Sequence, residues 1–322
     1  MPLELLDFIK QCDKFLVAGH KEPDGDCIGS QLALASALRR MGKEVILCSA
    51  GPFRRSEIKS YEQLFISGPS EKDRDRASLI ILDCSTLDRT GALQPYLEGL
   101  KMAVIDHHNV EITQNAVCYI DATAPSTTFM VMKLIKALGL ELNKAEAEYL
   151  FLGLCTDTGF FRHVDEEGAV AFDAAASLIR SGANPKAAHS MIYGGKSLDS
   201  RRLIGHILIK AESFFDGKLI MSYVEYEESC RFGLEGRSSD ALYQLFQSVA
   251  GVEAIVLLRQ ETPEKCSVGL RSRSWVDVSN IADSFGGGGH KNASGFSYAG
   301  TITGIKPKIM LAFENIFCPS SS

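Results

Sequence analysis

Four short stretches of the sequence bring carboxylates and imidazoles to the ends of apolar segments. The stretches are HKEPDGD, LIILD, VIDHH and LCTDTG, and their ionisable side chains are His20, Asp24, Asp26, Asp83, Asp106, His107, His108 and Asp157. If these side chains lie together without cations, the carboxylates repel one another and lose their hydration at a high cost. The set therefore predicts a site for divalent metal ions.

The donor types in this set limit which metal ions and which reaction are expected. Carboxylate and imidazole ligands without a thiolate suit manganese, iron or magnesium better than structural zinc. The candidate ligands are too many for one catalytic ion with open positions, so two ions are expected. Two-metal sites, with ions roughly 3.5–4 Å apart, activate water and stabilise in-line displacement at phosphorus.

The surrounding sequence predicts the elements that position these side chains. Apolar strands are expected at 14–20, 43–51, 77–85 and 102–108, and helices at 26–42, 126–139 and 143–159. Near-continuous apolar strands separated by helical stretches are typical of an α/β fold with a mainly parallel sheet and helices on both faces. Ligands bind at the carboxyl ends of such strands, where three of the four stretches lie.

Each side chain also has an ordinary structural interpretation. Asp26 could serve only as the N-cap of the helix that follows it, because Asp is a preferred cap. Asp83 could cap a turn, and Asp157 could accept bonds at a helix end. His107 and His108 could be surface residues. These alternatives stay open one by one, but four stretches at one end of a sheet favour the metal site.

The chain is long enough for two domains. We expect a catalytic domain over 1–192, a polar and glycine-bearing linker over 193–203, and a smaller α/β substrate-binding domain over 204–322. In the second domain, strands are expected at 218–226, 252–260 and 265–273, and helices at 238–249, 276–285 and 307–317.

Composition limits the partners. No apolar run approaches about 18 residues, so no membrane span is expected, and the N-terminus lacks a signal pattern. A net charge of −6 disfavours binding of a long duplex. The 9 cysteines are dispersed without a CxxC pair, which argues against a disulfide framework. A cytoplasmic protein is expected.

The four stretches, read with their flanks, carry a family resemblance. HKEPDGDCIGS, LIILDCS, VIDHHN and GLCTDTGFFRH resemble, in order, the four motifs of the DHH phosphoesterases. VGLRSR and FGGGGHKNASG resemble the glycine-rich DHH-associated domain of that family. The resemblance covers nearly the whole chain. The arrangement is similar to that of the compact bacterial oligoribonucleases (nanoRNases) and 3′-phosphoadenosine-5′-phosphate phosphatases, and to similar stand-alone cyclic-dinucleotide phosphodiesterases.

The resemblance implies ligands for two manganese ions, which Mg²⁺ or Co²⁺ could replace. One ion would be held by His20, Asp24 and Asp83. The other would be held by Asp26, Asp83, His107 and Asp157, so that Asp83 bridges the two. His108 would face the substrate phosphate, as an electrostatic stabiliser or a proton donor, and Asp106 would orient a neighbouring group.

The resemblance also implies that the second domain recognises the substrate. The candidate binding residues are Gly287, Gly288, Gly289, His290, Arg271 and Arg273, with Arg162 from the first domain. Glycines allow close approach of a phosphate or base, and Arg271 and Arg273 are expected to alternate on a strand and face one side. The glycine run could instead be a flexible linker, Arg273 a surface residue, and Arg162 part of a structural salt bridge.

The leading hypothesis is a manganese-dependent phosphodiesterase that degrades short single-stranded oligoribonucleotides to mononucleotides, with related activity on 3′-phosphoadenosine 5′-phosphate. A soluble phosphodiesterase for cyclic dinucleotides or linear dinucleotides is the alternative. A nucleotide-binding module without catalysis is a third hypothesis from another class. A homodimer is consistent with the resemblance.

Overall fold

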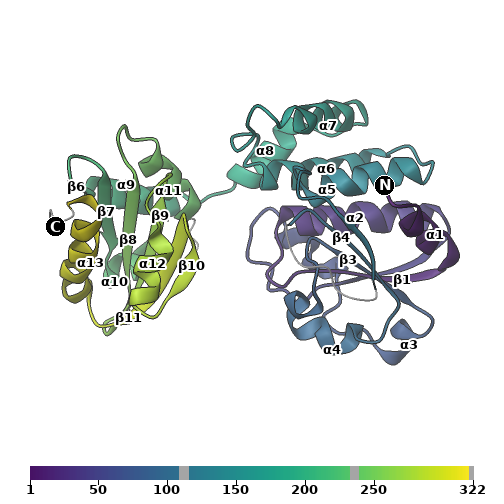
Figure 1. Cartoon of the computed structure of the whole chain (residues 1–322), viewed down its shortest axis with the longest axis horizontal. Helices are drawn as coiled ribbons and strands as arrows, with labels where there is room; N and C mark the ends of the chain where they lie inside the picture. The colour runs from purple at the N-terminus through teal and green to yellow at the C-terminus, as the bar shows by residue number, and fades with distance from the viewer. Residues whose placement is uncertain (109–115, 233–238, 319–322) are drawn as a thin grey trace. The chain divides into compact units, whose positions relative to one another are not determined.

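The computed structural model describes residues 1–108, 116–232 and 239–318. It divides into two compact units, Met1–Gly195 and Lys196–Ser322, which are described separately (Figure 1). Helix α9 (Leu198–Ile209) begins within the predicted linker, because the Ser197 hydroxyl caps its first turn by accepting from the Ser200 N–H at 3.1 Å. Residues 198–203, which were expected to belong to the linker, are therefore helical.

The first unit contains a five-stranded parallel sheet in the order β2-β1-β3-β4-β5. Its strands are β1 (Lys14–Gly19), β2 (Glu44–Cys48), β3 (Ser78–Leu82), β4 (Met102–Asp106) and β5 (Ala116–Ile120). The four strands expected from the sequence are confirmed, together with the parallel sheet. The half-buried β5, a short apolar strand of sequence AVCYI, was not predicted.

Helices cover both faces of this sheet (Figure 1). One face carries α1 (Leu3–Gln11), α2 (Gly25–Arg40), α5 (Thr127–Ala137) and α6 (Lys144–Asp157), while α7 (Ala169–Arg180) and α8 (Pro185–Tyr193) pack on α6. The other face carries α3 (Glu71–Arg74), α4 (Gln94–Leu97) and the 3₁₀ segment Leu87–Leu93. The 3₁₀ segment Lys59–Leu64 packs on the first core through Tyr61, whose ring meets that of Tyr149. Alternate residues of each strand fill the two cores: Phe15 and Val17 face the first, Leu16 and Ala18 the second.

The second unit contains a mixed six-stranded sheet in the order β10-β11-β9-β8-β7-β6. Its strands are β6 (Glu212–Phe214), β7 (Leu219–Val224), β8 (Ala254–Thr262), β9 (Lys265–Ser272), β10 (Gly288–His290) and β11 (Ala293–Ala299). Its further helices are α10 (Tyr226–Phe232), α11 (Ser239–Gln247), α12 (Val278–Ser284) and α13 (Ile302–Phe317). Helix α13 starts earlier than predicted, because Thr301 caps it and Pro307 lies inside it.

The start of α2 differs from the prediction. Asp24, not Asp26, is the N-cap: its Oδ1 accepts from the backbone N–H groups of Asp26 and Cys27 at 3.0 and 3.1 Å. The interpretation of Asp26 as a cap is therefore wrong. Its carboxylate lies in the first turn of the helix and is available for other contacts.

Close packing of α2 against α6 depends on a glycine. A Cβ on Gly29 would lie 2.4 Å from the carbonyl oxygen of Tyr149, a distance that requires the helices to separate. An ion pair ties the same helices together, with Arg40 Nη2 2.9 Å from the buried Glu146 carboxylate. The glycine thus sets how near α6, which ends at Asp157, lies to α2.

We predict that Gly29→Ala lowers the free energy of unfolding by about 1–3 kcal/mol, because the added methyl group overpacks the interface. Gly205→Ala is the matched control, since Gly205 is also helical and its Cβ would meet nothing within 4 Å. The control should be neutral or slightly stabilising. Chemical denaturation of both variants measures the difference, and equal stabilities would contradict this account of the interface.

Candidate metal centre

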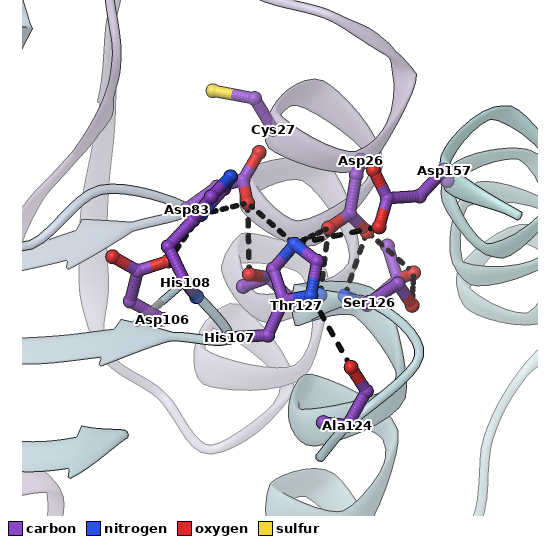
Figure 2. Close-up of polar contacts among 12 residues, drawn as sticks. Asp26, Cys27, Asp83, Asp106, His107, His108, Ala124, Ser126, Thr127 and Asp157 are labelled. Carbon is purple, nitrogen blue, oxygen red and sulfur yellow. Dashed lines mark hydrogen bonds and ion pairs between the residues drawn. The ribbon is translucent and has the colours of Figure 1, made fainter. Parts of the chain in front are cut away.

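Figure 2 shows predicted site residues of the first unit close together at the carboxyl edge of the sheet: Asp26, Asp83, Asp106, His107, His108 and Asp157. In the strand order β2-β1-β3, the chain leaves β1 and β3 in opposite directions, which makes their junction the usual ligand position in such folds. His20 follows β1 and Asp83 follows β3, so these two side chains flank that junction.

Asp83 presents its two carboxylate oxygens to different histidines. Its Oδ2 lies 3.4 Å from His20 Nε2, and its Oδ1 lies 3.7 Å from His107 Nε2. The residue has a φ of 63°, in the left-handed region that costs a non-glycine residue about 1–2 kcal/mol. This geometry fits a carboxylate shared between two cations.

Backbone carbonyls set the orientation of both histidines. His20 Nδ1 lies 2.8 Å from the Lys21 oxygen, and His107 Nδ1 lies 3.2 Å from the Ala124 oxygen. A carbonyl only accepts, so Nδ1 carries the hydrogen in each ring. Both Nε2 atoms therefore face the carboxylates, the arrangement found in metal-ligating histidines.

The His107 Nε2 atom is buried without a hydrogen-bond partner among the described residues. Asp157 Oδ2 lies 3.3 Å away and Asp26 Oδ2 4.0 Å away. Donor atoms that share one ion through bonds of about 2.1 Å lie roughly 3–4 Å apart. The donor set therefore fits a divalent cation among Asp26, Asp83, His107 and Asp157.

Asp26 is held in place by the start of α5. Its carboxylate accepts from the Thr127 N–H at 2.6 Å, and from the Thr128 N–H and hydroxyl at 2.8 and 2.7 Å. Sequence analysis missed both threonines. The signal was the STT run that opens the helix, because free N–H groups at a helix start bind carboxylates.

Burial and mutual repulsion raise the pKa values of the clustered acids. For Asp157, burial and the charges of Asp26 and Asp24 raise the pKa to about 8. Burial, then the same two neighbours and Asp157, raises the pKa of Asp83 well above its usual value. With a pKa of about 8, Asp157 holds its proton at neutral pH unless a cation neutralises it.

His108 and Asp106 form a separate pair beside this cluster. His108 Nδ1 lies 2.7 Å from Asp106 Oδ1, and the Ser85 hydroxyl donates to Asp106 Oδ2 at 2.6 Å. The bond from Asp106 raises the pKa of His108 to about 9 despite partial burial. The fully buried Asp106 thus orients a histidine whose side chain is 48% exposed. Ser85 was not anticipated.

Asp24 lies at the margin of the cluster. Its Oδ1, which caps α2, is 3.9 Å from His20 Nε2. Burial alone would lower the pKa of His20, but the neighbouring Cys27, the Lys21 carbonyl and Asp24 raise it to about 9.

The second unit brings two of the predicted binding residues into one row. Arg271 on β9 pairs with Ala293, which in turn pairs with His290 on β10, so all three side chains share a face. The Arg271 guanidinium lies 4.5 Å from the ring centre of Tyr243. The small Ala293 leaves space between a cation and an imidazole.

The glycines predicted to bind substrate, Gly287, Gly288 and Gly289, have a structural role in the sheet. The glycine run is not a flexible linker, because Gly288 and Gly289 belong to β10. Cβ atoms on Gly287 and Gly289 would meet β11 at 2.3 and 2.6 Å, so these glycines allow close packing of two backbones.

Two predicted arginines lie differently from the expectation. Strand β9 ends at Ser272, so Arg273 does not alternate with Arg271 on the strand as predicted; its N–H donates to the Glu253 oxygen at 2.8 Å. The exposed Arg162 folds onto its own turn and donates to the Gly159 carbonyl at 3.1 Å.

Comparison with known proteins supports this arrangement. Residues 14–154 match the DHH family N-terminal domain, and residues 216–309 match the DHHA1 domain. The bifunctional oligoribonuclease and PAP phosphatase NrnA of Thermus thermophilus is 32% identical over 285 residues, covering 88% of this chain and 84% of that protein. The Bacillus subtilis protein of the same description is 26% identical, covering 92% and 93%.

Solved structures share the fold. An exopolyphosphatase-related protein from Bacteroides fragilis superposes with a TM-score of 0.84 at 23% identity, covering 98% of this chain and 95% of that chain. Within the described residues, none of the helices combines the length and hydropathy needed to traverse a bilayer.

The parallel sheet, the acid and histidine cluster at its carboxyl edge and the two family matches define a phosphoesterase, a hydrolase of phosphate ester bonds. The chain belongs to the DHH family.

We predict that the metal-free protein loses stability as the pH rises from about 5 to about 8. Folding raises the pKa of Asp157 from 3.8 to about 8, so the folded state binds more protons than the unfolded state across this interval. His20 and His108, raised from 6.5 to about 9, act in the same direction at higher pH.

Differential scanning calorimetry measures this effect. The Tm of metal-free protein should fall over the interval, and Mn²⁺ should raise Tm more at the alkaline end, where the carboxylates are free to bind it. In Asp157→Asn the slope should be smaller. A Tm that stays constant or rises with pH in metal-free protein would contradict the electrostatic description.

Proposed function

We propose that this chain is a manganese-dependent two-metal phosphodiesterase that hydrolyses short oligoribonucleotides to mononucleotides and also acts on 3′-phosphoadenosine 5′-phosphate. The observation that carries the proposal is the position of the Asp83 carboxylate, with one oxygen toward His20 and the other toward His107. When bound, two divalent ions would supply activation of water and charge stabilisation at phosphorus.

The residues of the centre divide into ligands and supporting groups. His20, Asp24 and Asp83 would hold one ion, and Asp26, Asp83, His107 and Asp157 the other. Thr127 and Thr128 keep Asp26 in position, and the Ala124 carbonyl keeps His107 Nε2 turned toward the acids.

His108 would act on the substrate. With Nδ1 engaged by Asp106, Nε2 is the ring nitrogen left for a phosphate or a leaving oxygen. The bond to Asp106 favours the protonated imidazole, which stabilises negative charge and can donate a proton to the leaving group. Asp106 acts through His108 as a positioning residue, supported by Ser85.

The second unit offers side chains that would bind a small nucleotide substrate. Arg271 provides a planar guanidinium suited to a phosphate, and the row continues through Ala293 to His290. The identity to relatives described as oligoribonuclease and PAP phosphatase favours substrates with a phosphate beside a nucleoside.

Hydrolysis of cyclic or linear dinucleotides is the second candidate. It is favoured by the cyclic-di-AMP phosphodiesterase GdpP of Bacillus subtilis, which is 27% identical over 96% of this chain and 49% of that protein. Cytoplasmic location and a homodimer stay predictions from the sequence.

We predict Mn²⁺-dependent turnover that is fastest with dinucleotides and a five-residue RNA, with measurable release of phosphate from 3′-phosphoadenosine 5′-phosphate. The comparison set is cyclic di-AMP, its linear product pApA and pyrophosphate, assayed by chromatography of the products. His107→Ala should lower kcat by at least about 100-fold, since even the loss of a group that only supports a metal ligand costs 10–100-fold.

The matched control is Glu166→Gln, an exposed acid in the loop after the centre, which should retain full activity. Preference for cyclic di-AMP would favour the second candidate. No turnover of any compound would favour a binding module without catalysis, and near-normal turnover in His107→Ala would refute the proposed centre.

A further inference from the structure

A cysteine thiol lies inside the cluster that the sequence described only as oxygen and nitrogen donors. Cys27, in the first turn of α2, is fully buried. Ligand atoms of His20, Cys27 and Asp83 all lie within 4.8 Å of one another. Imidazole, thiol and carboxylate at this spacing are a metal-ligating set.

The local packing reserves space for this sulfur. Gly19 ends β1 directly before His20, and a Cβ at that position would lie 2.2 Å from Cys27 Sγ. A side chain on residue 19 would therefore displace the thiol. The glycine keeps the sulfur at the strand end, beside the imidazole.

Gln31 controls the direction of the thiol. Its side-chain amide nitrogen can donate to the carbonyls of Val17 and Cys48 at 3.1 and 3.2 Å, an orientation that satisfies both amide atoms. Its oxygen then occupies the position 3.4 Å from Cys27 Sγ and accepts the S–H. The sulfur lone pairs are left for the side where His20 lies.

We infer that Cys27 is a thiolate ligand of the metal position formed by His20 and Asp83. On coordination the S–H bond is replaced by a sulfur–metal bond, and the proton leaves to solvent. The inference rests on the proposed two-metal centre and deepens it, because the two positions then differ in their donors.

This difference sets metal selectivity. A thiolate favours softer ions such as zinc or cobalt over manganese, whereas the position formed by Asp26, His107 and Asp157 offers only oxygen and nitrogen. Manganese could fill both positions, but in competition with a softer ion the Cys27 position would give up manganese more readily than the other.

The test is a cobalt titration of the full-length, metal-free protein, with bound metal counted by equilibrium dialysis. The cobalt-loaded parent should show a near-ultraviolet sulfur-to-cobalt charge-transfer band. Cys27→Ser and Cys27→Ala should lose this band, and their preference for Co²⁺ over Mn²⁺ at this position should fall by more than about tenfold.

Cys84→Ser is the matched control, because Cys84 is also buried and adjoins Asp83 but packs in the apolar core on the other face of the sheet. It should keep the band. Circular dichroism reports whether each variant folds, and X-ray absorption of the zinc-loaded parent gives an answer independent of any variant, with sulfur expected at about 2.3 Å.

Bound cobalt without the band in the parent, a band that persists in Cys27→Ser, or a zinc environment without sulfur would each overturn the assignment of Cys27. In those cases the metal centre itself would stand. Failure of the parent to bind cobalt, zinc or manganese at all would instead reject the two-metal proposal together with this inference.

Discussion

Three carboxylates at one edge of a sheet, two of them buried and one half-buried, impose the main constraint on this molecule. Asp26, Asp83 and Asp157 all approach His107 Nε2, and their raised pKa values record the cost of placing like charges in a site with little water. Protons or divalent cations relieve that cost. At neutral pH, bound divalent cations would let every carboxylate ionise and would keep the set together.

The surrounding fold is organised to hold these groups. The junction of β1 and β3 places His20 and Asp83 side by side, and the start of α5 fixes Asp26 through backbone N–H groups. Gly29 allows α6 to approach α2 closely enough for Asp157, at the end of α6, to lie in the cluster. Carbonyl groups rather than side chains set the tautomers of His20 and His107, so the geometry of these two donors depends on the backbone more than on mobile surface groups.

Much of this site could be predicted from the sequence, because the carboxyl ends of parallel strands lie at the same edge of a sheet. Apolar runs that end in Asp83 and in His107 and His108 locate both the strands and the cluster. The roles of Asp24 and Asp26 could not be separated, since either Asp can cap a helix and only the backbone shows that Asp24 does.

Contacts between distant segments were also hidden from the sequence. The bonds from Thr127 and Thr128 to Asp26 join residues about a hundred positions apart in the sequence. From the sequence, Cys27 is expected to be an ordinary small hydrophobic residue, and only the folded chain brings it against Gly19. In the second unit, the expectation for Arg273 failed because a strand boundary is a property of the paired sheet and not of local alternation.

The central claim is that Asp83 bridges two ions, and electron paramagnetic resonance of the manganese-loaded protein tests it most directly. The account predicts two ions bound per chain and the spin-coupled signal of adjacent manganese ions, which Asp83→Asn should convert to uncoupled signals or abolish. Two bound ions that give only isolated signals in the parent, or a coupled signal that survives in Asp83→Asn, would contradict it.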